Sequence, residues 1–290
     1  MTVEHAIAHS LLKPWGAMDS RPWSSAGGND RTVGEIWYER SGPADVPPAL
    51  LLKLLLTSQP LSIQVHPGDA YARSMGLPNG KTEAWYVLSA TPEARIALGL
   101  KRRLTRQQLR QAINDGSISD LVVWQAVRAG DTAFVPAGTI HAIGAGLVIV
   151  EIQQRSDATF RLFDHGRGRE LHIEDAIAVA DAGPANIHVM PSRLTDNRTL
   201  LTSNSHFTFE KIDLAPNSTW WLEANRETWL LAVGGSARTG SFEISMGDAV
   251  FAQSDRLDIR AGVFGLSALL AYAGSLDTEL LRCTDMETVQ

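Results

Sequence analysis

Residues 130–167 carry the sequence GDTAFVPAGTIHAIGAGLVIVEIQQRSDATFRLFDHGR, and this stretch decides the fold. It sets His141 just after a Pro-Ala-Gly turn, between two apolar runs that are typical of β-strands. Upstream, the segments LSIQVHP and NGKTEAWYVL contribute three more polar side chains, which are Gln64, His66 and Glu83. Two imidazoles and two oxygen donors form a plausible set of ligands for one divalent metal ion. The sequence therefore indicates a site as well as a fold.

Most of the remaining chain consists of short strand-like segments separated by turn residues. In residues 61–66 the alternation places Gln64 and His66 on the same face, because strand side chains repeat every second residue. Two helices are expected, over residues 106–114 and 172–182, where apolar side chains recur at helical spacing. Many short strands punctuated by glycine and proline predict an all-β sandwich or barrel with a few short helices.

The chain is long enough for about two domains, since it has 290 residues. The Gly-Pro pair at residues 183–184 ends the second predicted helix, and a second β unit begins near residue 200. In that unit GDAVFAQ parallels GDTAFVP of the first, but no histidine follows at the matching place. We therefore expect a metal-binding catalytic domain over residues 1–185 and a degenerate copy without a metal site over residues 186–290.

Composition excludes several classes of protein. The net charge of -6 does not suggest the basic surface that binds nucleic acid, so an anionic substrate has to meet local positive charge. Cys283 is the single cysteine, which rules out an intrachain disulfide and favours a reducing compartment. The N-terminus does not resemble a signal peptide, and the apolar runs are too short to span a membrane. We expect a cytoplasmic protein; its sequence does not indicate an oligomeric state.

A resemblance to a known family follows from four ordered motifs. Residues 130–141 fit the second cupin motif, G-x5-P-x-G-x2-H, without a gap. Together with QVHPGDAYA, GKTEAWYVL and EIQQRSDATFRLFDHGR, this segment resembles the type I mannose-6-phosphate isomerases, in particular the short bacterial form. The likeness extends to LKPWG at residues 12–16, GEIWYE at residues 34–39 and LHIEDAI at residues 171–177, and it fades after about residue 180. It implies two cupin (jelly-roll) barrels.

The same resemblance implies a zinc-dependent interconversion of mannose 6-phosphate and fructose 6-phosphate. It implies four metal ligands, which are Gln64, His66, Glu83 and His141. It also implies four catalytic residues, which are Lys81, Glu151, Asp157 and Arg161.

The chemistry of an aldose–ketose isomerisation suits these residue types. A proton moves between C1 and C2 through an enediol or enediolate, so negative charge develops on two neighbouring oxygens, and a metal ion stabilises such charge. Glu151 and Asp157 are candidates for moving the proton. Arg161 is always charged and suits the developing oxyanion. Lys81 suits ring opening or binding of an oxygen, with a solvated loop lysine as the alternative.

Structural roles stay open for the other candidates. The Gln64 side chain is able to bind a coordinated water molecule instead of the metal ion. Asp157 is placed to cap a turn, and Glu151 to make a structural hydrogen bond. Arg161 has Asp164 nearby in sequence as a partner for an ion pair at the rim of the barrel.

Basic residues gather between residues 155 and 169. They are Arg155, Arg161, Arg167 and Arg169, and they alternate with acidic residues. Some of them are candidates for binding a phosphate group, and a solvated loop of mixed charge is the alternative. The sequence does not choose among them.

Three other functions compete with the sugar-phosphate isomerase. An isomerase of a free sugar would use the same scaffold. An Fe(II) oxygenase needs two histidines and a carboxylate, which this chain also offers. A non-catalytic sugar-binding cupin would bind its ligand and leave it unchanged.

Overall fold

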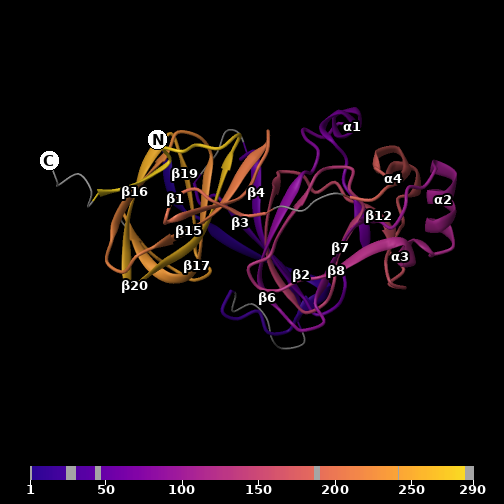
Figure 1. Ribbon diagram of the computed structural model, residues 1–290, viewed down its shortest axis with the longest axis horizontal. Coiled ribbons are helices and arrows are strands. Elements are labelled where there is room, and N and C mark those ends of the chain that lie inside the picture. Colours follow the sequence, from indigo (N-terminus) through magenta and orange to yellow (C-terminus); the bar gives the residue numbers. More distant parts are fainter. Residues whose placement is uncertain (1, 24–30, 43–46, 186–189, 241, 285–290) are drawn as a thin grey trace.

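Three antiparallel β-sheets and four short helices make up the described part of the chain (Figure 1). The computed structural model describes residues 2–23, 31–42, 47–185, 190–240 and 242–284. The C-terminal strands, drawn in orange and yellow, form one end of the molecule, and most of the N-terminal strands and the helices form the other (Figure 1). The all-β class expected from the sequence is confirmed.

A six-stranded sheet forms the middle layer. Its strands are, in spatial order, β2 (Ile7–Ala17), β3 (Val33–Glu39), β4 (Leu50–Thr57), β11 (Leu147–Gln154), β6 (Glu83–Ala90) and β9 (Thr132–Val135). Strand β4 is buried along its whole length because its two faces have different neighbours. Leu55 packs in a cluster with residues of the five-stranded sheet on one face, whereas Leu52 and Leu54 pack in a cluster with C-terminal residues on the other. A strand covered on both faces requires such a continuous apolar run.

A five-stranded sheet covers one face of this middle layer. Its strands are, in spatial order, β12 (Phe160–Phe163), β5 (Ile63–Val65), β10 (His141–Ile143), β7 (Arg95–Leu100) and β8 (Val122–Ala126). Ile96 and Ile143 of this sheet share an apolar cluster with Trp85 and Ile149 of the middle layer. The two sheets thus form the N-terminal sandwich that positions the site. Among the described residues, strand pairing does not close them into a hydrogen-bonded barrel.

Four short helices share an apolar cluster with the five-stranded sheet. They are α1 (Asp69–Ser74), α2 (Arg106–Asn114), α3 (Ile118–Leu121) and α4 (Ile173–Val179). The expected helix over residues 106–114 is confirmed, with a capping box at Thr105 and Gln108. The helix expected over residues 172–182 is shorter, because the Asp181 N–H donates to the carbonyl of Gly138, which draws the chain out of the helix into a bridge with the Pro-Ala-Gly turn.

The C-terminal strands form a ten-stranded sheet. Its main path runs β1 (Thr2–His5), β19 (Ala249–Gln253), β17 (Thr228–Thr239), β20 (Asp255–Ala273), β15 (Phe207–Leu214), β14 (Arg198–Ser203) and β13 (Ser192–Arg193). The others are β16 (Thr219–Ala224), β18 (Phe242–Ser245) and β21 (Leu281–Cys283). Strand β1 brings the start of the chain into this sheet by pairing with β19.

One apolar core joins the C-terminal sheet to the middle layer. Ile36 and Val150 of the middle layer lie in the same buried cluster as Phe207, Trp229 and Phe251 of the C-terminal sheet. The division of the chain at residue 185 into two domains stays a prediction. In the described part of the chain, every helix is too short or too polar to cross a membrane.

Candidate metal centre

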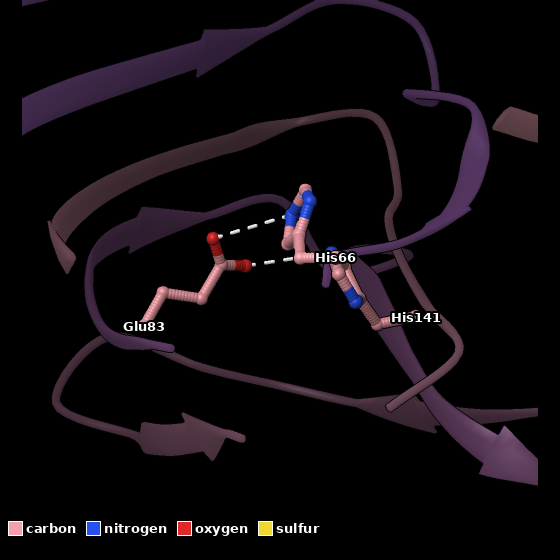
Figure 2. A group of neighbouring side chains, drawn as sticks. All are labelled: His66, Glu83 and His141. Carbon is pink, nitrogen blue, oxygen red and sulfur yellow. Dashed lines mark ion pairs between the residues drawn. The ribbon is translucent and has the colours of Figure 1, made fainter. Parts of the chain in front are cut away.

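Three buried side chains from both N-terminal sheets meet between the layers. His66 directly follows β5, His141 begins the neighbouring strand β10, and Glu83 begins β6 of the middle layer. Their ligand atoms all lie within 4.8 Å of one another. Figure 2 shows the Glu83 carboxylate directed toward the two imidazoles. Strand pairing and the packing of the two sheets therefore bring together residues that are up to 75 positions apart in sequence.

The Pro-Ala-Gly turn holds the two histidine segments together. The Gly138 N–H donates to the carbonyl of His66 at 2.8 Å. Gly138 has a φ of +86°, a conformation that glycine adopts without steric cost and other residues rarely adopt. The glycine of the motif is therefore needed to set His141 beside His66.

Both histidines direct the Nε2 atom toward the carboxylate. The His66 Nδ1 lies 2.8 Å from the Ala158 carbonyl, and the His141 Nδ1 lies 2.9 Å from the Thr139 carbonyl. Because a carbonyl oxygen only accepts, each Nδ1 carries the proton and each Nε2 presents a lone pair. These Nε2 atoms lie 3.4 Å from the two oxygens of Glu83. Orientation of a ligating imidazole by a backbone carbonyl is typical of metal sites.

The protonation states of the three side chains favour metal binding as well. Burial, together with the Lys81 ammonium, lowers the pKa of His66 to about 3, and burial also lowers the pKa of His141. Burial alone would raise the pKa of Glu83, but the neighbouring Lys81 holds it well below its ordinary value. The cluster thus offers two neutral imidazoles and a carboxylate.

The Glu83 carboxylate lacks hydrogen-bond donors among the described residues. The side chain is fully buried, and neither oxygen accepts a hydrogen bond from the described residues, although the Lys81 Nζ lies 3.1 Å from one of them. A buried charge is costly unless it is well paired or coordinates a metal ion. Two neutral imidazoles and a carboxylate fit a divalent ion such as zinc.

Gln64 lies next to this cluster, in register with His141 on the adjacent strand. Its Nε2 lies 3.3 Å from the His141 Nε2, and its Oε1 accepts a hydrogen bond from the Ser62 hydroxyl. To act as a ligand through oxygen, the amide has to turn over. The ligand role of Gln64 therefore stays a prediction, beside the alternative of binding a coordinated water molecule.

A polar pocket of about 240 Å³ adjoins the cluster. It is lined by all four predicted catalytic residues, which are Lys81, Glu151, Asp157 and Arg161. Gln64 also lines it. The apolar part of its wall comes from Trp15, Leu55, Leu61 and Ile143. The pocket therefore brings the four predicted catalytic residues together, and their roles in a reaction stay predictions.

Glu151 is fixed by its cross-strand neighbours. On β11 it lies opposite Trp85 of β6 and Lys53 of β4. The Trp85 indole N–H donates to Oε1 at 3.0 Å, and the Lys53 Nζ lies 3.6 Å from Oε2. Burial and the nearby Glu83 carboxylate raise the pKa of Glu151 above its ordinary value. The side chain makes the structural hydrogen bond that the sequence left open, and it also lines the pocket.

Lys81 is not the solvated loop lysine that the sequence offered as an alternative. It is 5% exposed, and its Nζ lies 3.1 Å from both the Glu83 Oε2 and the His66 Nε2. Although burial would lower it, the carboxylates of Glu83 and Glu151 raise the pKa of Lys81. A charged ammonium therefore stands between the cluster and the pocket.

Asp157 and Arg161 reach the pocket from the chain around β12. Asp157 is exposed to solvent at the pocket. Arg161 lies opposite Gln64 in the β12–β5 pair, and its Nη1 donates to the Glu170 carbonyl at 2.7 Å. Its suggested partner Asp164 instead pairs with Arg167 and Arg169.

Sequence reasoning missed Lys53 and Glu35, which also line the pocket. Lys53 interrupts a run of leucines, is 3% exposed, and stacks over the Trp37 ring at 4.6 Å. The Trp37 indole N–H donates to Glu35 at 2.6 Å. A single charged residue in a strand that otherwise consists of leucines up to its last residue, Thr57, was the signal, because a lysine is rarely buried without a partner.

Comparison with known proteins supports one family. No family model matches the sequence. The chain is 43% identical over 172 residues to the mannose-6-phosphate isomerase of Streptococcus mutans, covering 56% of this chain and 54% of that protein. It is 40% identical over 139 residues to mannose-6-phosphate isomerase ManA of Bacillus subtilis, covering 46% and 44%. The chain thus matches about half the length of these curated relatives, and the resemblance predicted from the motifs is confirmed.

Solved structures show the same fold over nearly the whole chain. The mannose 6-phosphate isomerase from Bacillus subtilis has a TM-score of 0.80 at 23% identity, covering 94% of this chain and 100% of that one. A zinc-bound mannose 6-phosphate isomerase has a TM-score of 0.70 at 16% identity, covering 95% and 100%. The arrangement of the C-terminal strands, which the motifs do not cover, is therefore shared as well.

Proposed function

We propose, on the premise that this chain is a relative of the mannose-6-phosphate isomerases, that it interconverts mannose 6-phosphate and fructose 6-phosphate. The observation that carries the proposal is the buried cluster of His66, Glu83 and His141, whose ligand atoms face one another beside a polar pocket. The names of the curated relatives support the choice of substrate.

His66, Glu83 and His141 would hold a divalent metal ion, for which we propose zinc, with Gln64 as the candidate fourth ligand. When bound, the ion supplies Lewis acidity that stabilises negative charge on the oxygens of the substrate. The backbone carbonyls that accept from each Nδ1 keep the two imidazoles in one orientation. The two imidazoles are thus oriented before the metal ion binds.

Glu151 is our candidate for moving the proton between C1 and C2. Its carboxylate lines the pocket, and the Trp85 indole and the Lys53 ammonium fix its orientation. Positioned proton transfer of this type contributes typically about 10²–10⁴-fold in rate. Asp157, at the exposed edge of the pocket, is the second carboxylate candidate, placed to exchange protons with the sugar hydroxyls.

Two cations are placed to bind the oxygens of the sugar. Arg161 lines the pocket with a guanidinium that remains charged, which suits the negative charge of an enediolate. The Lys81 ammonium lies at the buried end of the pocket, where it suits the ring oxygen during ring opening. Burial of this end limits the access of water, which strengthens both interactions.

We further propose residues 1–185 as the catalytic domain and residues 186–290 as a second domain without a metal site. A cytoplasmic location is part of the proposal, and the single cysteine supports it.

Substrate comparison tests the proposed function. The purified chain, loaded with zinc, is given mannose 6-phosphate or mannose, and formation of the ketose is followed in a coupled assay. We expect turnover of the phosphorylated sugar and little turnover of free mannose. Equal turnover of both would identify a free-sugar isomerase, whereas oxygen uptake with Fe(II) and no ketose would identify an oxygenase. Binding of mannose 6-phosphate without conversion would identify a non-catalytic sugar-binding protein.

A further inference from the structure

The charged groups of the pocket are unevenly balanced. Each lysine that lines it has its own carboxylate within 4.0 Å: Lys13 pairs with Glu35, Lys53 with Glu151, and Lys81 with Glu83. The arginines at the other side do not follow this pattern. Arg167 and Arg169 both pair with the single buried carboxylate of Asp164, whose charge also acts on Arg161.

A tight turn after β12 produces this arginine cluster. His165 and Gly166 both have positive φ, at 53° and 79°, and the His165 Nε2 lies 2.9 Å from the Leu61 carbonyl. The turn brings Arg167 and Arg169 back to Asp164. The Arg169 Nε donates to Oδ2 at 2.8 Å and its Nη2 donates to Oδ1, so this pair is bidentate, the strongest and most directional form of an arginine–carboxylate contact.

The structure distinguishes between the four arginines that the sequence left equivalent. Arg161 and Arg169 line the pocket. Arg167 does not line it, and its Nη1 donates to the Pro60 carbonyl at 2.9 Å. Arg155 lies 3.5 Å from the carboxylate of Glu39. Two guanidinium groups therefore remain available to a ligand in the pocket.

Arg161 in particular has unused donors. Its Nη1 donates to the Glu170 carbonyl, whereas its Nε is buried and has no hydrogen-bond partner among the described residues. The carboxylate of Glu170 is exposed, where solvent screens its charge. A buried, unpartnered guanidinium nitrogen beside a second arginine is a site that an anion would complete.

The pocket also runs from a wet end to a dry end. The side chain of Arg169 is 34% exposed and that of Lys13 is 32% exposed, whereas those of Lys81 and Glu151 are 6% and 4% exposed. A sugar phosphate is strongly hydrated at its phosphate and has to place C1 and C2 at the buried end. The exposed end at Arg169 therefore fits the phosphate, and the end next to the metal cluster, where Arg161 lies opposite Gln64, fits the reacting carbons.

We propose that Arg169 forms the subsite for the phosphate monoester of the substrate, with Asp164 as the residue that positions it. This inference rests on the proposed function and deepens it. It makes Arg169 a specificity-determining residue, since a free hexose has no anionic group to place against this guanidinium.

Inorganic phosphate and an Arg169→Gln variant test the subsite. For this variant we expect the KM for mannose 6-phosphate and the inhibition constant of inorganic phosphate to rise about 10- to 150-fold, the range for loss of one charged hydrogen bond. The loss should fall on KM more than on kcat, and zinc content should stay at the wild-type level. Arg193→Gln is the matched control, because Arg193 is an exposed arginine paired with Asp196 in the C-terminal sheet, and all these values should stay unchanged.

A second pair of variants guards against misfolding. Arg169→Lys keeps the charge and loses the planar fork, so a smaller rise in both constants is expected. Asp164→Asn removes the carboxylate that orients Arg169, and it should raise both constants without loss of zinc. If both constants stay within about twofold of the wild type in folded, active Arg169 variants, the subsite is wrong.

Calorimetry with inorganic phosphate separates this inference from the proposed function. It needs no turnover, so it applies even if the wild type does not convert mannose 6-phosphate. Weaker phosphate binding in Arg169→Gln would then support the subsite while the isomerase proposal fails. If the wild type converts mannose 6-phosphate but Arg169→Gln binds inorganic phosphate as tightly as the wild type, the isomerase proposal stands and the subsite is wrong.

Discussion

Replacing Glu83 with glutamine removes one charge from the centre of the cluster and almost no volume. Glu83 is fully buried, and its Oε2 lies 3.1 Å from the Lys81 Nζ. The substitution therefore separates two effects. It removes the carboxylate from the proposed ligand set, and it leaves the buried ammonium of Lys81 without its nearest partner.

The loss of stability follows from the second effect. Removing one partner of a buried ion pair costs about 3–5 kcal/mol, because the remaining charge is uncompensated. The carboxylates of Glu151 and Asp157 also act on Lys81, so we expect the lower end, about 3 kcal/mol. For a chain of this size, each kcal/mol shifts Tm by about 2–4 °C, so Tm should fall by about 6–12 °C.

Metal analysis and unfolding measure the two effects separately. Zinc content after dialysis should fall to background in Glu83→Gln, and the fall in Tm should persist when both proteins are measured with a chelator. Glu151→Gln is the matched control: it is an equally conservative change at another buried glutamate, and it should keep zinc while losing turnover. A Glu83→Gln protein with wild-type zinc content would refute the ligand assignment, and an unchanged Tm in chelator would refute the importance of the buried pair.

Three further variants test other parts of the site and the fold. Arg161→Ala should keep zinc and lose about 10²–10³-fold in kcat, as for removal of one oxyanion donor, and a metal-free variant would contradict this division of roles. Trp85→Phe removes the 3.0 Å hydrogen bond to Glu151, so we expect unfolding in urea to become easier by about 1–3 kcal/mol and kcat to fall, whereas a wild-type kcat would show that this bond does not orient the carboxylate. Arg198→Met strips the buried Glu210 of its bidentate partner in the C-terminal sheet, so stability should fall by about 3–5 kcal/mol while the folded enzyme keeps its kcat; a change in kcat would assign this sheet a part in the reaction.

Local patterns were sufficient for parts of the fold. The helix over residues 106–114 was predictable to the residue, because Thr105 and Gln108 form a capping box in front of a regular apolar stripe. The end of the second helix was not predictable, since a long-range hydrogen bond from Asp181 to Gly138 ends it. Helix α1 was missed because six residues are too few for a periodic pattern.

The site divides in the same way. The cupin motif and its neighbours indicated His66, Glu83 and His141, because each ligand is marked by the residues of its own segment. The pocket position of Lys53 depends on the pairing of β4 with β11, which brings the Glu151 carboxylate opposite this lysine. The burial of Lys81 depends in the same way on the packing of the sheets around it. Such pairing across strands is not contained in the spacing of any one segment.

Removal and return of the metal tests the central claim most directly. The wild-type protein is depleted with a chelator, and conversion of mannose 6-phosphate to fructose 6-phosphate is measured before and after addition of zinc. The cluster of His66, Glu83 and His141 predicts that activity disappears with the metal and returns with zinc. Full activity in a protein shown to contain no metal would contradict it.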